Sequence, residues 1–131
     1  MAKIIHTMIR VRDLAPSLKF YAEAFDLKPT LTLDRSDFAL VYLRNAESDM
    51  ELELTYNKGR EEPYTHGDGY GHIAVVVDDV VAKRSMLVSQ GYQPTPIKEF
   101  KADEELIARF FFIQDPDGYK IEVLERYGHY V

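Results

Sequence analysis

An internal repeat constrains this chain more than any other feature of its sequence. Residues 5–14 and 71–80 each carry a histidine at the second position, continue as a β-prone run, and close on an aspartate followed by an apolar residue. The two histidines, His6 and His72, are 66 positions apart. Each run precedes a segment with helical spacing and then three strand-like runs, so each half of the chain follows the order β-α-β-β-β.

Apolar periodicity and turn residues predict the boundaries of these elements. The carboxylates of Asp13 and Asp79 can accept hydrogen bonds from the free amides of a first helical turn, which predicts helices over 14–25 and 80–90. Gly91 suits the left-handed position that ends the second helix. Strands are expected over 30–33, 38–44 and 50–56 in the first half, and over 95–101, 106–113 and 119–124 in the second.

These elements predict an α+β fold in one domain that covers residues 1–131. Module one is expected over about 1–58, a linker over about 59–69, and module two over about 70–127. A four-stranded sheet with one helix has one covered face and one bare face. Two such modules can therefore form a curved mixed sheet that encloses a cleft.

Composition and charge exclude several classes of protein. The net charge is −6 and no basic cluster is visible, which argues against nucleic-acid binding and against anionic membrane surfaces. No apolar stretch is long enough to cross a bilayer, and no secretory signal is visible at the N-terminus. Because the chain has no cysteine, it has neither disulfides nor thiolate ligands. A cytoplasmic protein without a membrane or nucleic-acid partner is expected.

Two histidines and two glutamates recur at matching places of the two modules. The last strand of each module contains a glutamate, Glu53 or Glu122, and the separations from His6 and His72 are 47 and 50 residues. Side chains alternate across a strand, so both glutamates face away from the apolar residues that pack under the helices. Two imidazoles and two carboxylates suit a divalent first-row ion such as Ni²⁺, Co²⁺, Zn²⁺ or Fe²⁺. The other two histidines, His66 and His129, have no counterpart in the repeat and are expected at the surface.

The chain resembles the glyoxalase I family, the lactoylglutathione lyases of the vicinal oxygen chelate superfamily. The resemblance lies in four stretches: 6–11 (HTMIRV), 53–57 (ELTYN), 70–74 (YGHIA) and 115–122 (DPDGYKIE). It implies one metal site with His6, Glu53, His72 and Glu122 as ligands. It also implies a homodimer in which His6 and Glu53 come from one subunit and His72 and Glu122 from the other. For a chain of this short type the implied ion is Ni²⁺ or Co²⁺, with Zn²⁺ as the choice of longer relatives.

The resemblance also implies a reaction, the isomerisation of the hemithioacetal of methylglyoxal and glutathione to S-lactoylglutathione through an enediolate. A divalent ion makes the carbon acid easier to deprotonate, and a carboxylate carries the proton. By resemblance Glu122 is the main base, Glu53 lies symmetrically across the metal, and Arg10 and Asn57 contact glutathione. The segment Lys98–Arg109 departs from the family because it is acidic where relatives often have a Lys-Gly-Gly-like loop. Residues 68–71 also lack the arginine of some relatives, which leaves another thiol open as the co-substrate.

Other functions keep the same fold. An extradiol dioxygenase uses two histidines and one carboxylate on Fe²⁺, and the fourth ligand Glu53 disfavours that reading. An epimerase or a thiol transferase would use the same type of metal site. A drug-sequestering protein of the bleomycin-resistance type would bind a small molecule without catalysis, but such proteins generally lack the ligands that this chain contains.

Overall fold

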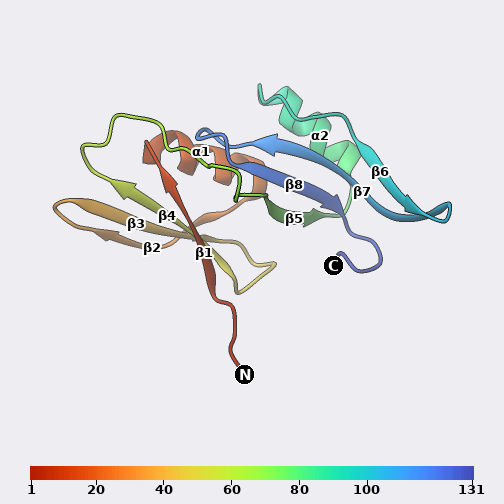
Figure 1. The fold of residues 1–131 in the computed structure, drawn as a ribbon, viewed down its shortest axis with the longest axis horizontal. Helices are drawn as coiled ribbons and strands as arrows, with labels where there is room; N and C mark the ends of the chain where they lie inside the picture. Colours follow the sequence, from red (N-terminus) through yellow and green to blue (C-terminus); the bar gives the residue numbers. More distant parts are fainter. The chain divides into compact units, whose positions relative to one another are not determined.

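The computed structural model describes residues 1–131, which divide into two units, Met1–Thr65 and His66–Val131. The first unit contains one helix and four strands in the predicted order (Figure 1). In the sheet the strands lie in the order β1-β4-β3-β2, with β1 and β4 parallel and the other neighbours antiparallel. The elements are β1 His6–Val11, α1 Leu14–Phe25, β2 Lys28–Asp34, β3 Phe38–Arg44 and β4 Glu51–Asn57.

The second unit repeats this topology. Its sheet has the order β5-β8-β7-β6, again with the first pair parallel and the other pairs antiparallel. A parallel pair needs a crossover between its strands, and in both units the helix and two strands provide it. The elements are β5 Ile73–Val77, α2 Val80–Ser89, β6 Lys98–Ala102, β7 Glu105–Gln114 and β8 Lys120–Glu125. The predicted β-α-β-β-β modules and the α+β class are confirmed.

Both helices begin where the sequence predicts. The carboxylate of Asp13 accepts a hydrogen bond from the Ala15 amide at 3.3 Å, and that of Asp79 accepts one from the Ala82 amide at 2.9 Å. Gly91 follows α2 in the left-handed region, with φ 91°. Neither helix has the length and apolar character needed to span a membrane.

One predicted strand begins later than expected, because Thr95 lies outside the ladder and β6 starts at Lys98. Thr95 instead donates its amide to the Phe112 carbonyl and accepts the Phe112 amide through its hydroxyl. Pro94 and Pro96 flank it and have no amide hydrogen, so a regular strand cannot form here. Thr95 therefore attaches to β7 through one backbone hydrogen bond and one hydrogen bond to its side chain.

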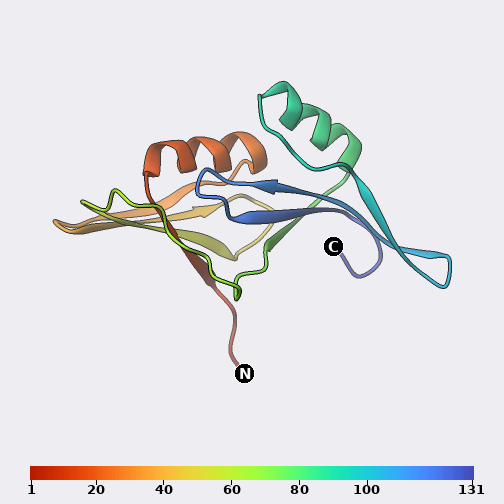
Figure 2. The same cartoon turned by 45° about the horizontal axis from the view of Figure 1, so that its top comes forward.

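The core of each unit lies between its helix and one face of its sheet (Figure 2). In β4, Leu52 and Leu54 are buried toward the helix, as the alternation predicts. In β8, Ile121 and Val123 are buried in the same way. The opposite face of each sheet is the one that carries the predicted metal ligands.

Candidate metal centre

The second unit brings two of the predicted ligands into contact. His72 immediately precedes β5, and its Nε2 lies 2.8 Å from Oε2 of Glu122 in β8. A first-row ion binds histidine nitrogen and carboxylate oxygen at about 2.1 Å, so adjacent ligands of an octahedral ion lie about 3 Å apart. The observed spacing therefore fits two neighbouring ligands of one divalent ion. The Glu122 side chain is 16% exposed, which leaves it accessible from the helix-free face of the sheet.

The first unit carries the other two predicted ligands on adjacent strands. His6 begins β1, and Glu53 lies in the middle of β4. Met8 is the parallel neighbour of Glu53, so the histidine is two residues before the strand partner of the glutamate. Glu53 is buried, with 8% of its surface exposed, whereas His6 is exposed.

The two pairs occupy the same strand register in their units. In the second unit Ala74 is the parallel neighbour of Glu122, and His72 is again two residues before that neighbour. The sequence separations of 47 and 50 residues differ because the intervening helices, strands and loops differ in length, while the register is the same. The repeat detected in the sequence is therefore a repeat of strand register, and it puts one His/Glu pair on the helix-free face of each sheet.

In neither unit do three or more histidine, aspartate or glutamate side chains gather into a group that could hold a metal ion. The predicted ligands form two pairs, one in each unit. A third carboxylate near the first pair is already engaged, because Glu51, the strand neighbour of His6, accepts a hydrogen bond from the Thr30 hydroxyl. The four-ligand site consequently stays a prediction; only His72 and Glu122 are in direct contact, and His6 and Glu53 share a sheet face on adjacent strands.

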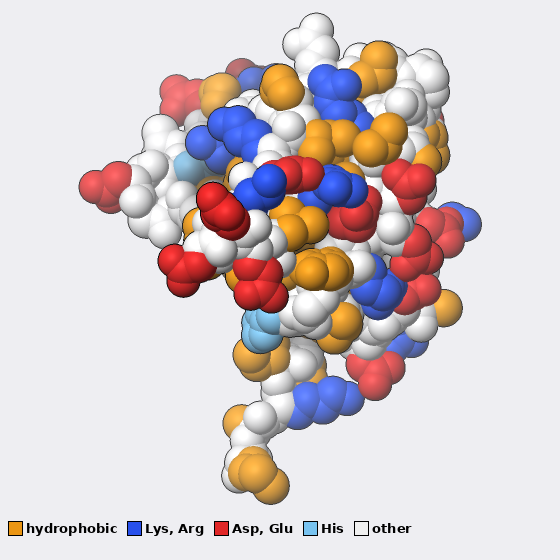
Figure 3. Space-filling model, turned by 90° about the vertical axis from the view of Figure 1, so that its right-hand side faces the viewer, with side chains coloured by type: hydrophobic (Ala, Val, Ile, Leu, Met, Phe, Trp, Pro, Cys, Tyr) orange, Lys and Arg blue, Asp and Glu red, His pale blue; other side chains and the backbone are white.

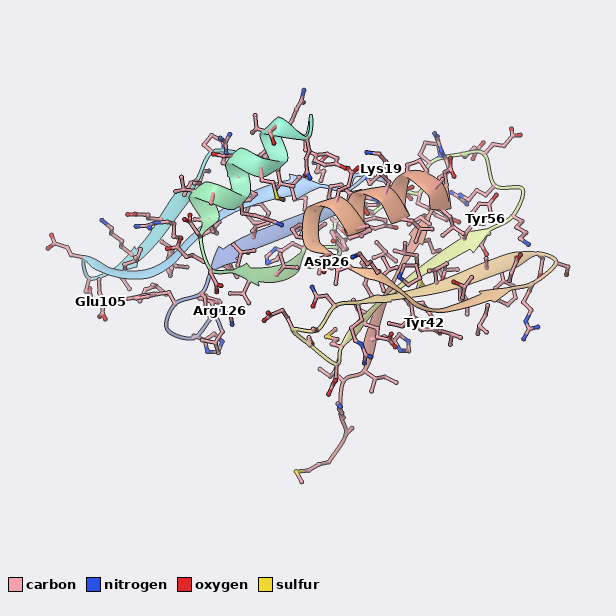
Figure 4. All side chains as sticks on the ribbon, turned by 180° about the vertical axis from the view of Figure 1, so that it is seen from behind. Lys19, Asp26, Tyr42, Tyr56, Glu105 and Arg126 are labelled. Atoms are coloured by element: carbon pink, nitrogen blue, oxygen red, sulfur yellow. The ribbon has the colours of Figure 1, made fainter.

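A tyrosine that no sequence feature indicated lies beside both His6 and Glu53. Tyr42 of β3 is the antiparallel neighbour of Glu53, and its ring meets the edge of His6 with a centroid distance of 5.6 Å. The Tyr42 hydroxyl donates a hydrogen bond to the Glu53 carboxylate. This hydrogen bond, together with burial and the charges of Glu53 and Glu51, raises the pKa of Tyr42 above its ordinary value. Figure 4 shows Tyr42 on the face of the sheet away from α1 and Tyr56 on the α1 side.

The predicted substrate contacts lie on the same face of the first sheet. Arg10 of β1 is exposed two residues beyond Met8, and Asn57 ends β4 four residues beyond Glu53. At about 3.3 Å per residue, Asn57 is about 13 Å from Glu53 along the strand, somewhat more than the roughly 10 Å that three extended residues span. The Asn57 amide donates to the Tyr64 hydroxyl at 3.0 Å, and Arg60 lies 3.9 Å over the Tyr64 ring.

The segment Lys98–Arg109 forms a hairpin of β6 and β7. Arg109 donates to both Glu99 and Glu125, and Lys101 lies 3.5 Å from Glu99. The hydrogen bond from Arg109, aided by Lys101, lowers the pKa of Glu99. The segment contains three cations, Lys98, Lys101 and Arg109, and the last two are thus paired within the second unit. Acidic and basic side chains are interspersed among hydrophobic ones on the side of the molecule shown in Figure 3.

One expectation for the remaining histidines is wrong. His129 is exposed as predicted, but His66 is half-buried and stacks on Tyr119 with a centroid distance of 4.1 Å. The side chain of Tyr70 packs at 5.7 Å from His66, and the Nε2 of His66 is buried without a hydrogen-bond partner. The expectation rested on the absence of a repeat counterpart, which carries no information about aromatic packing in a loop.

The sequence matches the family described as the Glyoxalase/Bleomycin resistance protein/Dioxygenase superfamily over residues 3–123. It is 39% identical over 128 residues to a lactoylglutathione lyase of Haemophilus influenzae, with 94% of this chain and 92% of that protein covered. Among solved structures, the trypanothione-dependent glyoxalase I of Leishmania major is 36% identical with a TM-score of 0.75, covering 95% of this chain and 87% of that one. Glyoxalase I of Zea mays is 30% identical with a TM-score of 0.83, covering 96% of this chain and 45% of that longer one.

Proposed function

Because this chain belongs to the glyoxalase I family of the Glyoxalase/Bleomycin resistance protein/Dioxygenase superfamily, we propose that it is a metal-dependent lactoylglutathione lyase. The observation that carries the proposal is the His/Glu pair that recurs at the same strand register in both units. His6, Glu53, His72 and Glu122 would hold one divalent ion per site. Ni²⁺ or Co²⁺ is favoured over Zn²⁺, as the resemblance to short-chain relatives implies.

The proposed substrate is the hemithioacetal formed from methylglyoxal and glutathione, the substrate class implied by the names of the relatives. A divalent ion held by the four ligands would act as a Lewis acid and stabilise the negative charge of the enediolate. Glu122 removes the proton from C1 and delivers it to C2, while the C1 hydroxyl proton passes to the C2 oxygen. The hemithioacetal thereby becomes a thioester with the same atoms.

Glu53 is the residue of the first module that corresponds to Glu122, and it serves as a metal ligand and as the second carboxylate of the site. Arg10 and Asn57 are proposed to bind glutathione, which carries two carboxylates, from the same sheet face as His6 and Glu53. The acidic hairpin of β6 and β7 leaves a thiol other than glutathione as the alternative co-substrate. We further propose a homodimer with sites at the subunit interface and a cytoplasmic location.

The proposal is tested by removing bound metal with a chelator and restoring Ni²⁺, Co²⁺ or Zn²⁺ separately. Formation of the thioester from methylglyoxal and glutathione is then followed by absorbance. We expect turnover with Ni²⁺ or Co²⁺ and weaker turnover with Zn²⁺. Stoichiometric metal binding without turnover for any ion would contradict lactoylglutathione lyase activity and leave another enzyme of the superfamily.

The metal site itself is tested with one ligand removed from each unit. The double variant Glu53→Gln, His72→Ala loses half of the donor set, so we expect it to lose stoichiometric Ni²⁺ binding in an equilibrium titration. Urea unfolding of the metal-free proteins serves as the control for folding. A double variant that folds and retains its metal in full contradicts the four-ligand site.

A further inference from the structure

One hydroxyl group distinguishes the two otherwise matching halves of the candidate site. In the first unit the antiparallel neighbour of Glu53 is Tyr42, and in the second unit the antiparallel neighbour of Glu122 is Phe112. The two rings meet their histidines in the same way, with centroid distances of 5.6 Å to His6 and 5.5 Å to His72 and interplanar angles of 82° and 76°. The ring packing is common to both units, and only the tyrosine carries a donor.

The hydroxyl of Tyr42 has a definite partner. It donates a hydrogen bond to Glu53, a carboxylate that is only 8% exposed. A buried carboxylate is costly unless donors satisfy its oxygens, so this bond stabilises one position of the Glu53 side chain. A carboxylate has two oxygens, and one hydrogen bond still leaves an oxygen available for a metal ion. Glu122 is more exposed, and its strand neighbour Phe112 has no group that could donate to it.

We propose that Tyr42 is a positioning residue that holds Glu53 as the fixed carboxylate of the site and leaves Glu122 as the carboxylate that moves to carry the proton. This inference rests on the proposed function. Hydrogen bonds from neighbouring groups orient metal-ligating carboxylates and strengthen metal binding. A carboxylate that must detach and transfer a proton benefits from the absence of such a bond. The difference between Tyr42 and Phe112 thus assigns different roles to two glutamates that the repeat makes equivalent.

The test exchanges the two residues. Tyr42→Phe removes the hydroxyl from the first unit, so that its ring matches that of the second. Phe112→Tyr adds a hydroxyl to the second unit, and both substitutions keep the aromatic ring. Tyr56→Phe is the matched control, because it removes a hydroxyl from the neighbouring strand on the helix side of the same sheet. For each variant we would measure the Ni²⁺ affinity of the metal-free protein by competition with a chromogenic chelator, kcat and KM for the hemithioacetal, and stability in urea.

Tyr42→Phe is expected to weaken Ni²⁺ binding by about tenfold and to lower kcat more than it changes KM. Tyr56→Phe is expected to leave the Ni²⁺ affinity unchanged. Phe112→Tyr is expected to raise the Ni²⁺ affinity and lower kcat, because it fixes the mobile glutamate. In the double exchange the affinity should return toward that of the unaltered protein while kcat stays low, which a purely structural role of Tyr42 would not produce.

Two results overturn the inference. One is a Tyr42→Phe protein whose Ni²⁺ affinity equals that of the unaltered protein, and the other is a double exchange that restores affinity and kcat together. Failure of the proposed function is distinguishable, because it appears as an unaltered protein that binds Ni²⁺ but produces no thioester. In that case the Ni²⁺ affinities of the Tyr42→Phe and Tyr56→Phe proteins still decide whether Tyr42 holds Glu53.

Discussion

At the scale of single residues, the side chains proposed to bind the rest of the substrate lie on the same sheet face as His6 and Glu53. Asn57 lies on this face at the end of β4, and Tyr64 fixes the orientation of its amide through a 3.0 Å hydrogen bond. The Tyr64 ring is in turn covered by Arg60. An amide held in this way is preorganised for binding, since it loses little conformational freedom when a ligand arrives.

Asn57→Ala is therefore expected to raise KM for the hemithioacetal by about tenfold with little change in kcat. A lost hydrogen bond to a charged group costs about 1.5 kcal/mol of binding free energy, and this loss is the same in the ground state and the transition state. Steady-state kinetics with the Ni²⁺-loaded protein measures the effect. Tyr64→Phe is the control, since it removes the orienting hydroxyl and keeps the amide, and a smaller rise in KM is expected. An Asn57→Ala protein with unchanged KM would mean that this amide serves the loop around Tyr64 and not the substrate.

At the scale of elements, the hairpin between β6 and β7 contains backbone strain. Its two-residue turn consists of Asp103 with φ 50° and Glu104 with φ 66°. Two consecutive left-handed residues are typical of a type I′ turn, in which Asn-Gly is strongly preferred because asparagine tolerates and glycine readily adopts a positive φ. The pairing of Arg109 with Glu99 and Glu125 ties β7 to both of its neighbours below this turn.

The double substitution Asp103→Asn, Glu104→Gly should relieve this strain and raise the free energy of unfolding by about 1 kcal/mol. Urea unfolding of the metal-free proteins, monitored by circular dichroism, measures the change. The reverse control places β-branched residues in the turn, as in Asp103→Val, Glu104→Val, which should destabilise the protein. If Asn-Gly leaves the unfolding midpoint unchanged, the two residues do not adopt left-handed conformations in solution.

The sequence predicts the elements well where local signals decide them. The bounds of α1 match the prediction at both ends, because Asp13 caps the helix and apolar spacing defines its buried side. The prediction of element bounds is less accurate where neighbouring residues or paired strands decide the conformation. Thr95 has a β-prone side chain, but two flanking prolines move the strand start to Lys98. The conformation of Glu104 was also not predictable, because glutamate, unlike aspartate, rarely adopts a positive φ, and the paired strands impose it here.

At the scale of the whole molecule, duplication explains how much of the candidate site the sequence contains. The His/Glu pairs follow from the repeat alone, since equal register in two modules requires only equal order of strands. The role proposed for Tyr42 does not follow, because its comparison with Phe112 requires the pairing of β3 with β4 and of β7 with β8. A residue whose significance depends on a cross-strand neighbour 11 positions away is not visible in a motif.

The proposed homodimer, in which each site combines His6 and Glu53 of one subunit with His72 and Glu122 of the other, predicts complementation between inactive chains. One chain would carry His6→Ala and Glu53→Gln, and the other His72→Ala and Glu122→Gln. Each chain alone has two broken sites, whereas a mixed dimer has one intact and one doubly broken site. Random pairing gives half of the dimers mixed, so refolding an equal mixture should recover about a quarter of the unaltered activity and Ni²⁺ binding.

Each inactive chain refolded by itself is the control and should recover nothing, which excludes reversion of either variant by the refolding procedure. Native mass spectrometry of the mixture shows whether mixed dimers form and whether they carry one Ni²⁺ each. If the modules instead pair within one chain, every site in the mixture lacks two ligands, and mixed dimers would bind no metal. Mixed dimers without Ni²⁺ would therefore contradict the intersubunit site while leaving the four ligands and their chemistry intact.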